Sequence, residues 1–169
     1  EEEVEALPVL VQPADMFADI VRVAEEKAAT AGNALEGHSL ASLAAELAGR
    51  PIRVATMCSG TESPLLALDL IAKAIHAQHG VALNVEHVFS CEIEPFKQAY
   101  IERNFAPPIL FRDIRELDGE SATTAYGSAQ PVPGEVDLLV AGTSCVDYSN
   151  LNTKQKGIDQ KGESGQTFW

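Results

Sequence analysis

The sequence predicts an α/β fold built on a mostly parallel β-sheet. Short β-rich runs alternate with helical patterns through residues 51–142, and such alternation is typical of strands joined by right-handed helical crossovers. The composition agrees with this prediction. The chain has 169 residues, of which 46% are hydrophobic and 22% charged, which suits one globular domain with a buried core.

Residues 1–50 are expected to form an acidic, helical N-terminal extension, and residues 51–169 the α/β domain. Apolar side chains at helical spacing predict a first helix from about Ala14 to Ala31. A second helix is predicted from Ser39 to Ala48, with Ser39 as its N-cap. The simplest interpretation is that both helices only pack against the core. Residues 1–12 are expected to be extended or loose.

Six elements are predicted in the α/β domain, and one segment stays ambiguous. The strands and helices, in chain order, are IRVATM (52–57), a helix over 63–80, VEHVFSC (85–91), a helix over 95–105, PILFRDI (108–114) and EVDLLVAG (135–142). Pro64 in the first turn and Gly80 after the end support the first of these helices. The Ser-, Thr-, Pro- and Gly-rich segment from Gly119 to Gly134 is considered for a short helix.

Cysteine usage and charge exclude several classes of protein. The three cysteines lie far apart and form no Cys-x-x-Cys pattern, which argues against a disulfide framework or a structural zinc site and favours an intracellular protein. No apolar run is long enough to span a membrane. The formal net charge of −13 repels phosphate, so this chain has no basic surface for nucleic acid.

Ligands of such sheets bind beyond the carboxyl ends of the strands, so the residues at these ends are site candidates. The first strand runs into the small-residue turn MCSGTESP, where backbone N–H groups can approach a ligand. After the second strand, Glu92 can accept hydrogen bonds from ribose hydroxyls, with Glu94 as the alternative; either carboxylate could instead cap the next helix. After the third strand, Asp113 could accept from an adenine amino group beside Ile114, or simply start a turn.

The fourth strand ends in AGTSCVDYSNLN, which presents Cys145. This thiol could be a nucleophile, a metal ligand or a small core residue. Metal ligation lacks partners in the sequence, and the polar neighbours Ser144, Asp147 and Ser149 argue against deep burial. The position therefore favours a nucleophile that faces a cofactor crevice.

Taken together, these stretches resemble the cytosine-5 DNA methyltransferases, which use S-adenosyl-L-methionine. CSGTESPLLALD resembles the family's first motif, with Glu62 in place of the second glycine. SCEIEPFKQAYIERNF contains the ribose-binding acid at Glu92, and RDI contains the adenine-contacting Asp113. GTSCVDYS resembles the catalytic Pro-Cys motif, with Ser144 in place of proline, and the following KQKGIDQKGESGQTFW resembles the loop after it. The resemblance covers about Ile52 to Trp169.

The resemblance implies a Rossmann-like S-adenosylmethionine-dependent methyltransferase fold, incomplete in this chain. It implies methyl transfer to carbon 5 of cytosine in DNA through a covalent adduct of Cys145, without a metal, inside the cell and in the nucleus if the source is eukaryotic. The cofactor-binding residues that it implies are Cys58, Ser59, Gly60, Thr61, Glu92, Ile93, Asp113, Ile114 and Gly142.

The family's later motifs and its target-recognition domain have no counterpart here, so the chain is expected to be a fragment that is inactive alone and that reaches DNA through parts of a longer protein. The fourth strand would then lie at an open sheet edge. Two alternatives remain. A catalytically inactive cofactor-binding or scaffold module is suggested by Ser144 and Glu62, and a small-molecule methyltransferase is disfavoured by Cys145.

Overall fold

The computed structural model describes residues 12–30, 50–144 and 152–154 of the chain. Its elements, in chain order, are α1 (Pro13–Thr30), β1 (Ile52–Met57), α3 (Ser63–His79), β2 (Val85–Cys91), α4 (Pro95–Phe105), β3 (Leu110–Phe111), the 3₁₀ helix η1 (Ile114–Glu116), β4 (Ser121–Thr123), β5 (Ala129–Pro131) and β6 (Leu138–Ala141).

Most of the predicted elements are confirmed. The bounds of β1, β2 and α4 agree with those expected, and α1 and α3 agree to within one residue at each end. Gly80 ends α3 in a left-handed conformation (φ +69°) and donates its N–H to the His76 carbonyl at 2.9 Å, which satisfies one of the last carbonyls of the helix. The helix expected over 39–48 lies outside the described residues.

Three expectations on elements are corrected. The third strand is only Leu110–Phe111, because the Asp113 carboxylate caps η1 and turns the chain away from the sheet. The short helix considered between Gly119 and Gly134 is wrong, since β4 and β5 form an antiparallel hairpin there. The fourth strand starts only at Leu138, after the left-handed Glu135 (φ 57°) has interrupted the extended chain.

The sheet has the strand order β3-β2-β1-β6, which agrees with the predicted mostly parallel, Rossmann-like arrangement. β1 pairs in parallel with β6, and β2 with β3. β1 and β2 also run the same way, because hydrogen bonds join Ile52 to Asn84 at their starts and Cys58 to Cys91 at their ends. All four strands therefore present their carboxyl ends at one edge. Among the described residues β6 pairs only with β1, as expected for an edge strand.

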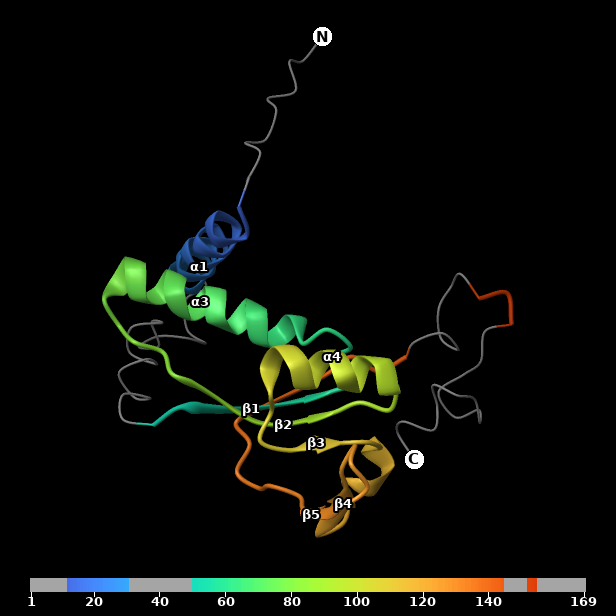
Figure 1. Ribbon diagram of the computed structural model, residues 1–169. Helices are drawn as coiled ribbons and strands as arrows, with labels where there is room; N and C mark the ends of the chain where they lie inside the picture. The colour runs from blue at the N-terminus through green and yellow to red at the C-terminus, as the bar shows by residue number, and fades with distance from the viewer. Residues whose placement is uncertain (1–11, 31–49, 145–151, 155–169) are drawn as a thin grey trace. The chain divides into compact units, whose positions relative to one another are not determined.

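The chain divides into two compact units, Glu1–Ile52 with Leu66–Val85, and Arg53–Leu65 with Glu86–Trp169. This division does not test the domain boundary predicted after residue 50, which stays a prediction. In the described part of the first unit, α1 packs on α3 through Val21, Ala74 and Ile75 (Figure 1). No described helix is long and apolar enough to cross a membrane.

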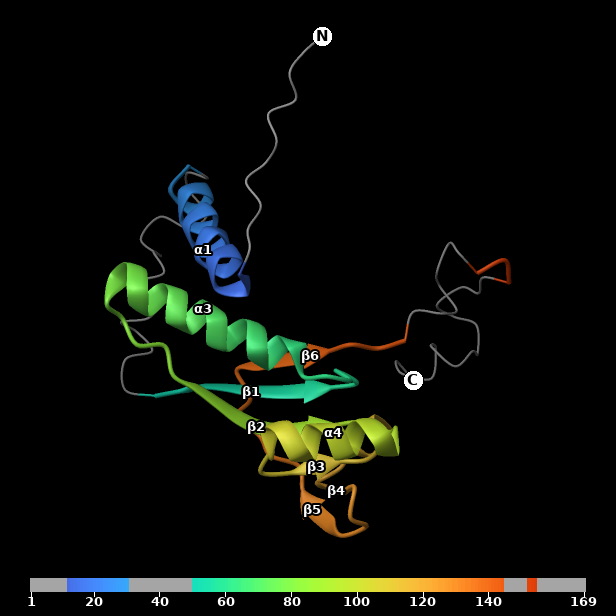
Figure 2. The same cartoon turned by 45° about the horizontal axis from the view of Figure 1, so that its top comes forward.

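The second unit contains the strand ends and therefore the candidate site. α4 lies along one face of the sheet over β2 and β3, and Figure 2 shows β6 beside β1. The core of this unit is centred on the rings of Phe89 and Phe111, which meet edge to face with centroids 5.5 Å apart. The β4–β5 hairpin continues from β3 through an antiparallel bridge between Phe111 and Thr124. This packing makes the carboxyl ends of β1, β2 and β3 a defined edge.

Candidate cofactor site at the strand ends

The turn after β1 is unusually tight. Cys58, Gly60 and Glu62 all take left-handed conformations, with φ of 52°, 66° and 55°. Glycine adopts this conformation freely, whereas the other two residues are strained there and must be held by their surroundings. One such restraint is the Cys58 N–H, which donates to the Cys91 carbonyl at 2.8 Å and ties the turn to the end of β2.

Gly142, directly after β6, lies against the same turn. Its N–H donates to the Met57 carbonyl at 2.9 Å, and a Cβ atom at this position would stand 2.7 Å from the Cys58 carbonyl oxygen. Since that neighbour is backbone and cannot swing away, only glycine fits without a shift of the turn. The structure therefore brings together the first and fourth strand ends, as the sequence predicted for a shared crevice.

Replacing Gly142 by alanine is expected to displace the turn and to destabilise the protein by about 1–3 kcal/mol, the usual cost of overpacking. The matched control is Gly134→Ala, because no atom lies within 4 Å of a Cβ built at Gly134. Thermal unfolding of the full-length variants measures the difference. Equal unfolding temperatures for the two variants would contradict the close packing of Gly142.

Glu92 is the acid that the structure places at the end of β2. Its side chain is buried, and its Oε1 accepts hydrogen bonds from the N–H groups of Ile93 (3.0 Å) and Glu94 (3.2 Å). Its Oε2 is buried and has no partner among the described residues. An unpartnered buried carboxylate oxygen is costly, so it indicates a missing donor such as a ligand hydroxyl. The residue thus fits a nucleoside cofactor.

The alternative acid, Glu94, is exposed. It occupies the N-cap position of α4, but its side chain makes no capping hydrogen bond. The structure therefore supports neither a buried binding role for Glu94 nor a side-chain cap. Lys97, in the first turn of α4, was not singled out from the sequence; its Nζ lies 4.0 Å from Glu92 Oε1.

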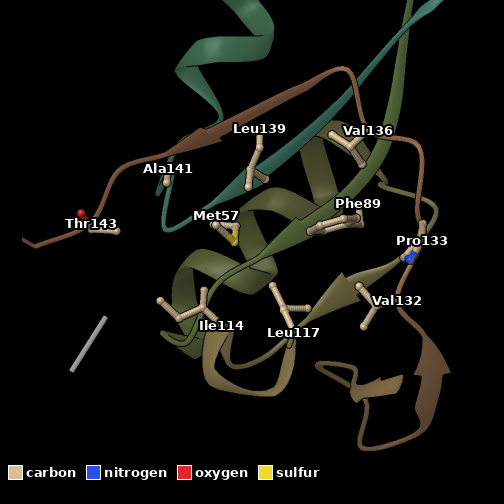
Figure 3. A pocket seen from close by; sticks show the side chains of 10 residues that line it. All are labelled: Met57, Phe89, Ile114, Leu117, Val132, Pro133, Val136, Leu139, Ala141 and Thr143. Carbon is tan, nitrogen blue, oxygen red and sulfur yellow. The ribbon is translucent and has the colours of Figure 1, made fainter. Parts of the chain in front are cut away.

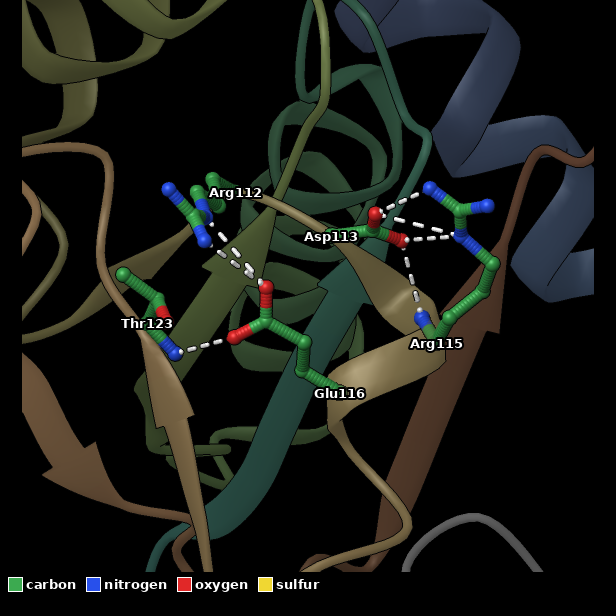
Figure 4. Close-up of polar contacts among 5 residues, drawn as sticks. All are labelled: Arg112, Asp113, Arg115, Glu116 and Thr123. Atoms are coloured by element: carbon green, nitrogen blue, oxygen red, sulfur yellow. Dashed lines mark hydrogen bonds and ion pairs between the residues drawn. The ribbon is translucent and has the colours of Figure 1, made fainter.

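Asp113 both caps η1 and pairs with an arginine (Figure 4). Its carboxylate accepts from the Arg115 N–H at 3.0 Å and from the Arg115 guanidinium, with Oδ2 to Nη2 at 2.5 Å. The hydrogen bonds from the Arg115 side chain, followed by that from its backbone, lower the pKa of Asp113 against the opposing effect of burial. The turn-starting interpretation is thus confirmed. The carboxylate keeps further lone pairs, which can accept a hydrogen bond from an adenine amino group.

A second arginine–carboxylate pair, shown in the same figure, fixes the hairpin beside this site. Glu116 Oε1 accepts from the Arg112 guanidinium at 3.2 Å, and its Oε2 accepts from the Thr123 N–H at 2.8 Å. These contacts link η1 to β4. The position of Asp113 is therefore set by the hairpin as well as by the end of β3.

An apolar hollow of about 510 Å³ opens beside the strand ends (Figure 3). It is lined by Met57, Phe89, Ile114, Leu117, Val132, Pro133, Val136, Leu139, Ala141 and Thr143. Of the predicted cofactor residues, Ile114 lines this hollow, whereas Glu92 and Asp113 do not. The hollow can accommodate an apolar body such as a ring, and it has no charged lining residue to hold a polar group.

The thiols of the described strand ends are not poised as nucleophiles. Burial raises the pKa of Cys58, the charge of Glu92 raises it further, and Lys97 partly opposes this. Burial likewise raises the pKa of Cys91 far above its ordinary value. A thiol must lose its proton to attack, so both are unreactive at neutral pH. Cys145, the predicted nucleophile, lies outside the described residues.

The remaining predicted cofactor residues are described but have mixed environments. Ser59 Oγ is buried with no partner among the described residues, which again suits a missing ligand. Thr61 is exposed, with its hydroxyl 2.9 Å from that of Ser63. Ile93 is 57% exposed, so its side chain is free to pack on a ring. The part of the chain that the structure describes holds no cluster of three or more metal-ligating residues.

A mostly parallel sheet whose carboxyl edge carries a tight turn and a buried acid defines a Rossmann-like α/β protein. The chain belongs to the C-5 cytosine-specific DNA methylase family, whose sequence profile matches residues 57–169.

Two relatives carry the name DNA (cytosine-5-)-methyltransferase DMT5. The protein from Cryptococcus neoformans var. grubii is 71% identical over 129 residues, or 76% of this chain. The protein from Verticillium dahliae is 48% identical over 107 residues, or 60% of this chain. The matched region is only 5% of the first relative's length and 4% of the second's.

Proposed function

We propose that the protein containing this chain transfers a methyl group from S-adenosyl-L-methionine to carbon 5 of cytosine in DNA. The observation that carries the proposal is the buried Glu92 carboxylate, whose Oε2 lacks a partner beside the tight turn of a chain in this family. The names of the two relatives support the same reaction.

The cofactor would lie along the carboxyl edge of the sheet. Glu92 Oε2 would accept a hydrogen bond from a ribose hydroxyl, and Asp113 one from the adenine amino group. Ile93 and Ile114 would pack on the adenine ring. The backbone of residues 58–61 and of Gly142 would border the methionine part, where N–H groups of a tight turn can meet a carboxylate. When bound, the cofactor supplies an electrophilic methyl group on its sulfonium.

Cys145 would supply the nucleophile of a covalent mechanism. The target cytosine is flipped out of the duplex into the site. The Cys145 thiolate bonds to carbon 6 of the ring, which makes carbon 5 electron-rich enough to take the methyl group. A base then removes the proton from carbon 5, and the bond to Cys145 breaks as the ring recovers its double bond. Cys145 is thus released from the ring as the same thiolate that attacked it.

DNA contacts would come from other parts of the protein, because the formal net charge of −13 opposes binding of a phosphate backbone by this chain itself. A DNA substrate would also place the protein in the nucleus if its source is eukaryotic. The alternative of an inactive cofactor-binding module rests on Ser144 and Glu62, which stand at the positions of a family proline and glycine.

Covalent trapping tests the proposal and separates it from the alternative. The full-length protein is incubated with S-adenosyl-L-methionine and duplex DNA that contains 5-fluorocytosine, and the products are separated under denaturing conditions. A cofactor-dependent protein–DNA adduct is expected, because fluorine at carbon 5 cannot leave as a proton does. A duplex in which 5-methylcytosine replaces cytosine is the control. Cofactor binding without any adduct would support the inactive module instead.

A further inference from the structure

A fully buried carboxylate lies behind the turn after β1. Glu62 is 0% exposed, and its Oε1 accepts hydrogen bonds from Thr56 Oγ1 at 2.8 Å and Ser90 Oγ at 2.7 Å. Thr56 belongs to β1 and Ser90 to β2, and both are also fully buried. The residue at the left-handed end of the turn is thereby joined to two neighbouring strands.

The two hydroxyls also contact each other and a histidine. Thr56 Oγ1 lies 3.2 Å from Ser90 Oγ. Ser90 Oγ lies 2.9 Å from His87 Nε2, and the tautomer of the imidazole decides which of these two groups donates. The result is a chain of bonds that runs from His87 through Ser90 to Glu62. Each group in this chain restrains the next.

Glu62 has no exposed side-chain surface, and its Oε2 is buried without a partner among the described residues, so its restraining contacts run through Oε1 alone. Hydrogen bonds partly offset the hydration that a buried carboxylate loses. Here the bonds to Oε1 also hold the strained turn, whose residue at this position has φ of 55°. The glycine that the family resemblance leads one to expect would relieve the strain but would provide no such link to the strands.

We infer that Glu62 is a positioning residue of the cofactor site, because its acceptor oxygen fastens the turn of residues 58–62 to β1 and β2 through Thr56 and Ser90. The inference rests on the proposed function for the identity of the cofactor. It concerns the acceptor oxygen rather than the charge, because no described cation contacts Glu62. A glutamine at this position keeps the acceptor oxygen, whereas an alanine removes it. Neither residue is glycine, so the left-handed backbone at position 62 stays strained in both variants.

The test compares Glu62→Ala with Glu62→Gln in the full-length protein. The alanine variant is expected to raise the KM for S-adenosyl-L-methionine by about 10- to 100-fold, which corresponds to the loss of two buried hydrogen bonds, with kcat changed less than about threefold. The glutamine variant is expected to stay within about threefold of the wild-type KM, since it keeps the acceptor. Glu94→Ala, which removes an exposed carboxylate without a cap bond, is the matched control.

A second measurement does not depend on the cofactor. Hydrogen exchange of the Cys58 amide, which is bonded to the Cys91 carbonyl, is expected to accelerate in Glu62→Ala and not in Glu62→Gln. If Glu62→Ala fails to fold, Ser90→Ala and Thr56→Val each remove one donor and are expected to give smaller changes of the same kind. Unchanged exchange and KM in the alanine variant would overturn the inference, as would a glutamine variant as impaired as alanine. Failure of the wild-type protein to bind S-adenosyl-L-methionine would instead contradict the proposed function.

Discussion

Methyl transfer by the full-length protein is expected to be abolished when Cys145 is replaced by alanine. The loss should be at least about 1,000-fold, because removal of a nucleophile removes the covalent route altogether. Transfer of labelled methyl groups to duplex DNA measures the rate, and the adduct with 5-fluorocytosine DNA should vanish in the same variant.

Cofactor affinity provides the internal control for this experiment. Binding of S-adenosyl-L-methionine to Cys145→Ala is expected to stay within about threefold of wild type, because the variant removes a group that acts on cytosine and not on the cofactor. A variant that methylates DNA at the wild-type rate would show that Cys145 is not the nucleophile. The two described strand-end thiols would remain poor substitutes, since burial raises the pKa of both Cys58 and Cys91.

Replacing Glu92 by alanine is expected to weaken cofactor binding by about 10- to 1,000-fold, which corresponds to one or two charge-assisted hydrogen bonds. The carboxylate has two functions that the variant removes together. Its Oε2 is the unpartnered acceptor for a ribose hydroxyl, and its Oε1 holds the N–H groups of Ile93 and Glu94. Isothermal titration of the full-length protein with S-adenosyl-L-methionine measures the effect.

Glu92→Gln separates these two functions. The glutamine oxygen can still accept from the backbone, so the local structure should persist, while the amide nitrogen replaces the oxygen proposed to face the ribose. We therefore expect Glu92→Gln to bind weakly and to unfold at nearly the wild-type temperature. Glu94→Gln, whose side chain is exposed, serves as the matched control and should bind normally. Unaltered affinity in Glu92→Gln would exclude Glu92 as the ribose acceptor.

Local pattern in the sequence was sufficient to predict most of the elements. The continuous apolar run of β1 is buried on both faces, as its Val54, Ala55 and Thr56 show, and such runs are typical of parallel strands. The start of α4 also follows from a nearby residue, because Pro95 opens the helix. These signals depend on neighbours in the chain, so they are readable without a tertiary structure.

The elements predicted wrongly depend on distant partners. Ser121–Thr123 becomes a strand because it pairs with Ala129–Pro131 and because the Thr123 N–H donates to Glu116. Asp113 shortens β3 because its carboxylate binds Arg115 and caps η1. Pairing and capping of this kind compete with the β-propensity of the apolar run, and propensity alone cannot decide between them.

The sequence by itself determined the fold class and the ends of β1 and β2, after the second of which Glu92 stands, because hydrophobic period and chain order are properties of the sequence. Only the tertiary structure decided how Glu62, Gly142 and Cys58 act together. Glu62 looked like a departure from a glycine motif, yet it accepts hydrogen bonds from two strands whose contributing residues stand 34 positions apart in the chain. Contacts of such separation arise from the packing of parallel strands, and no local pattern encodes them.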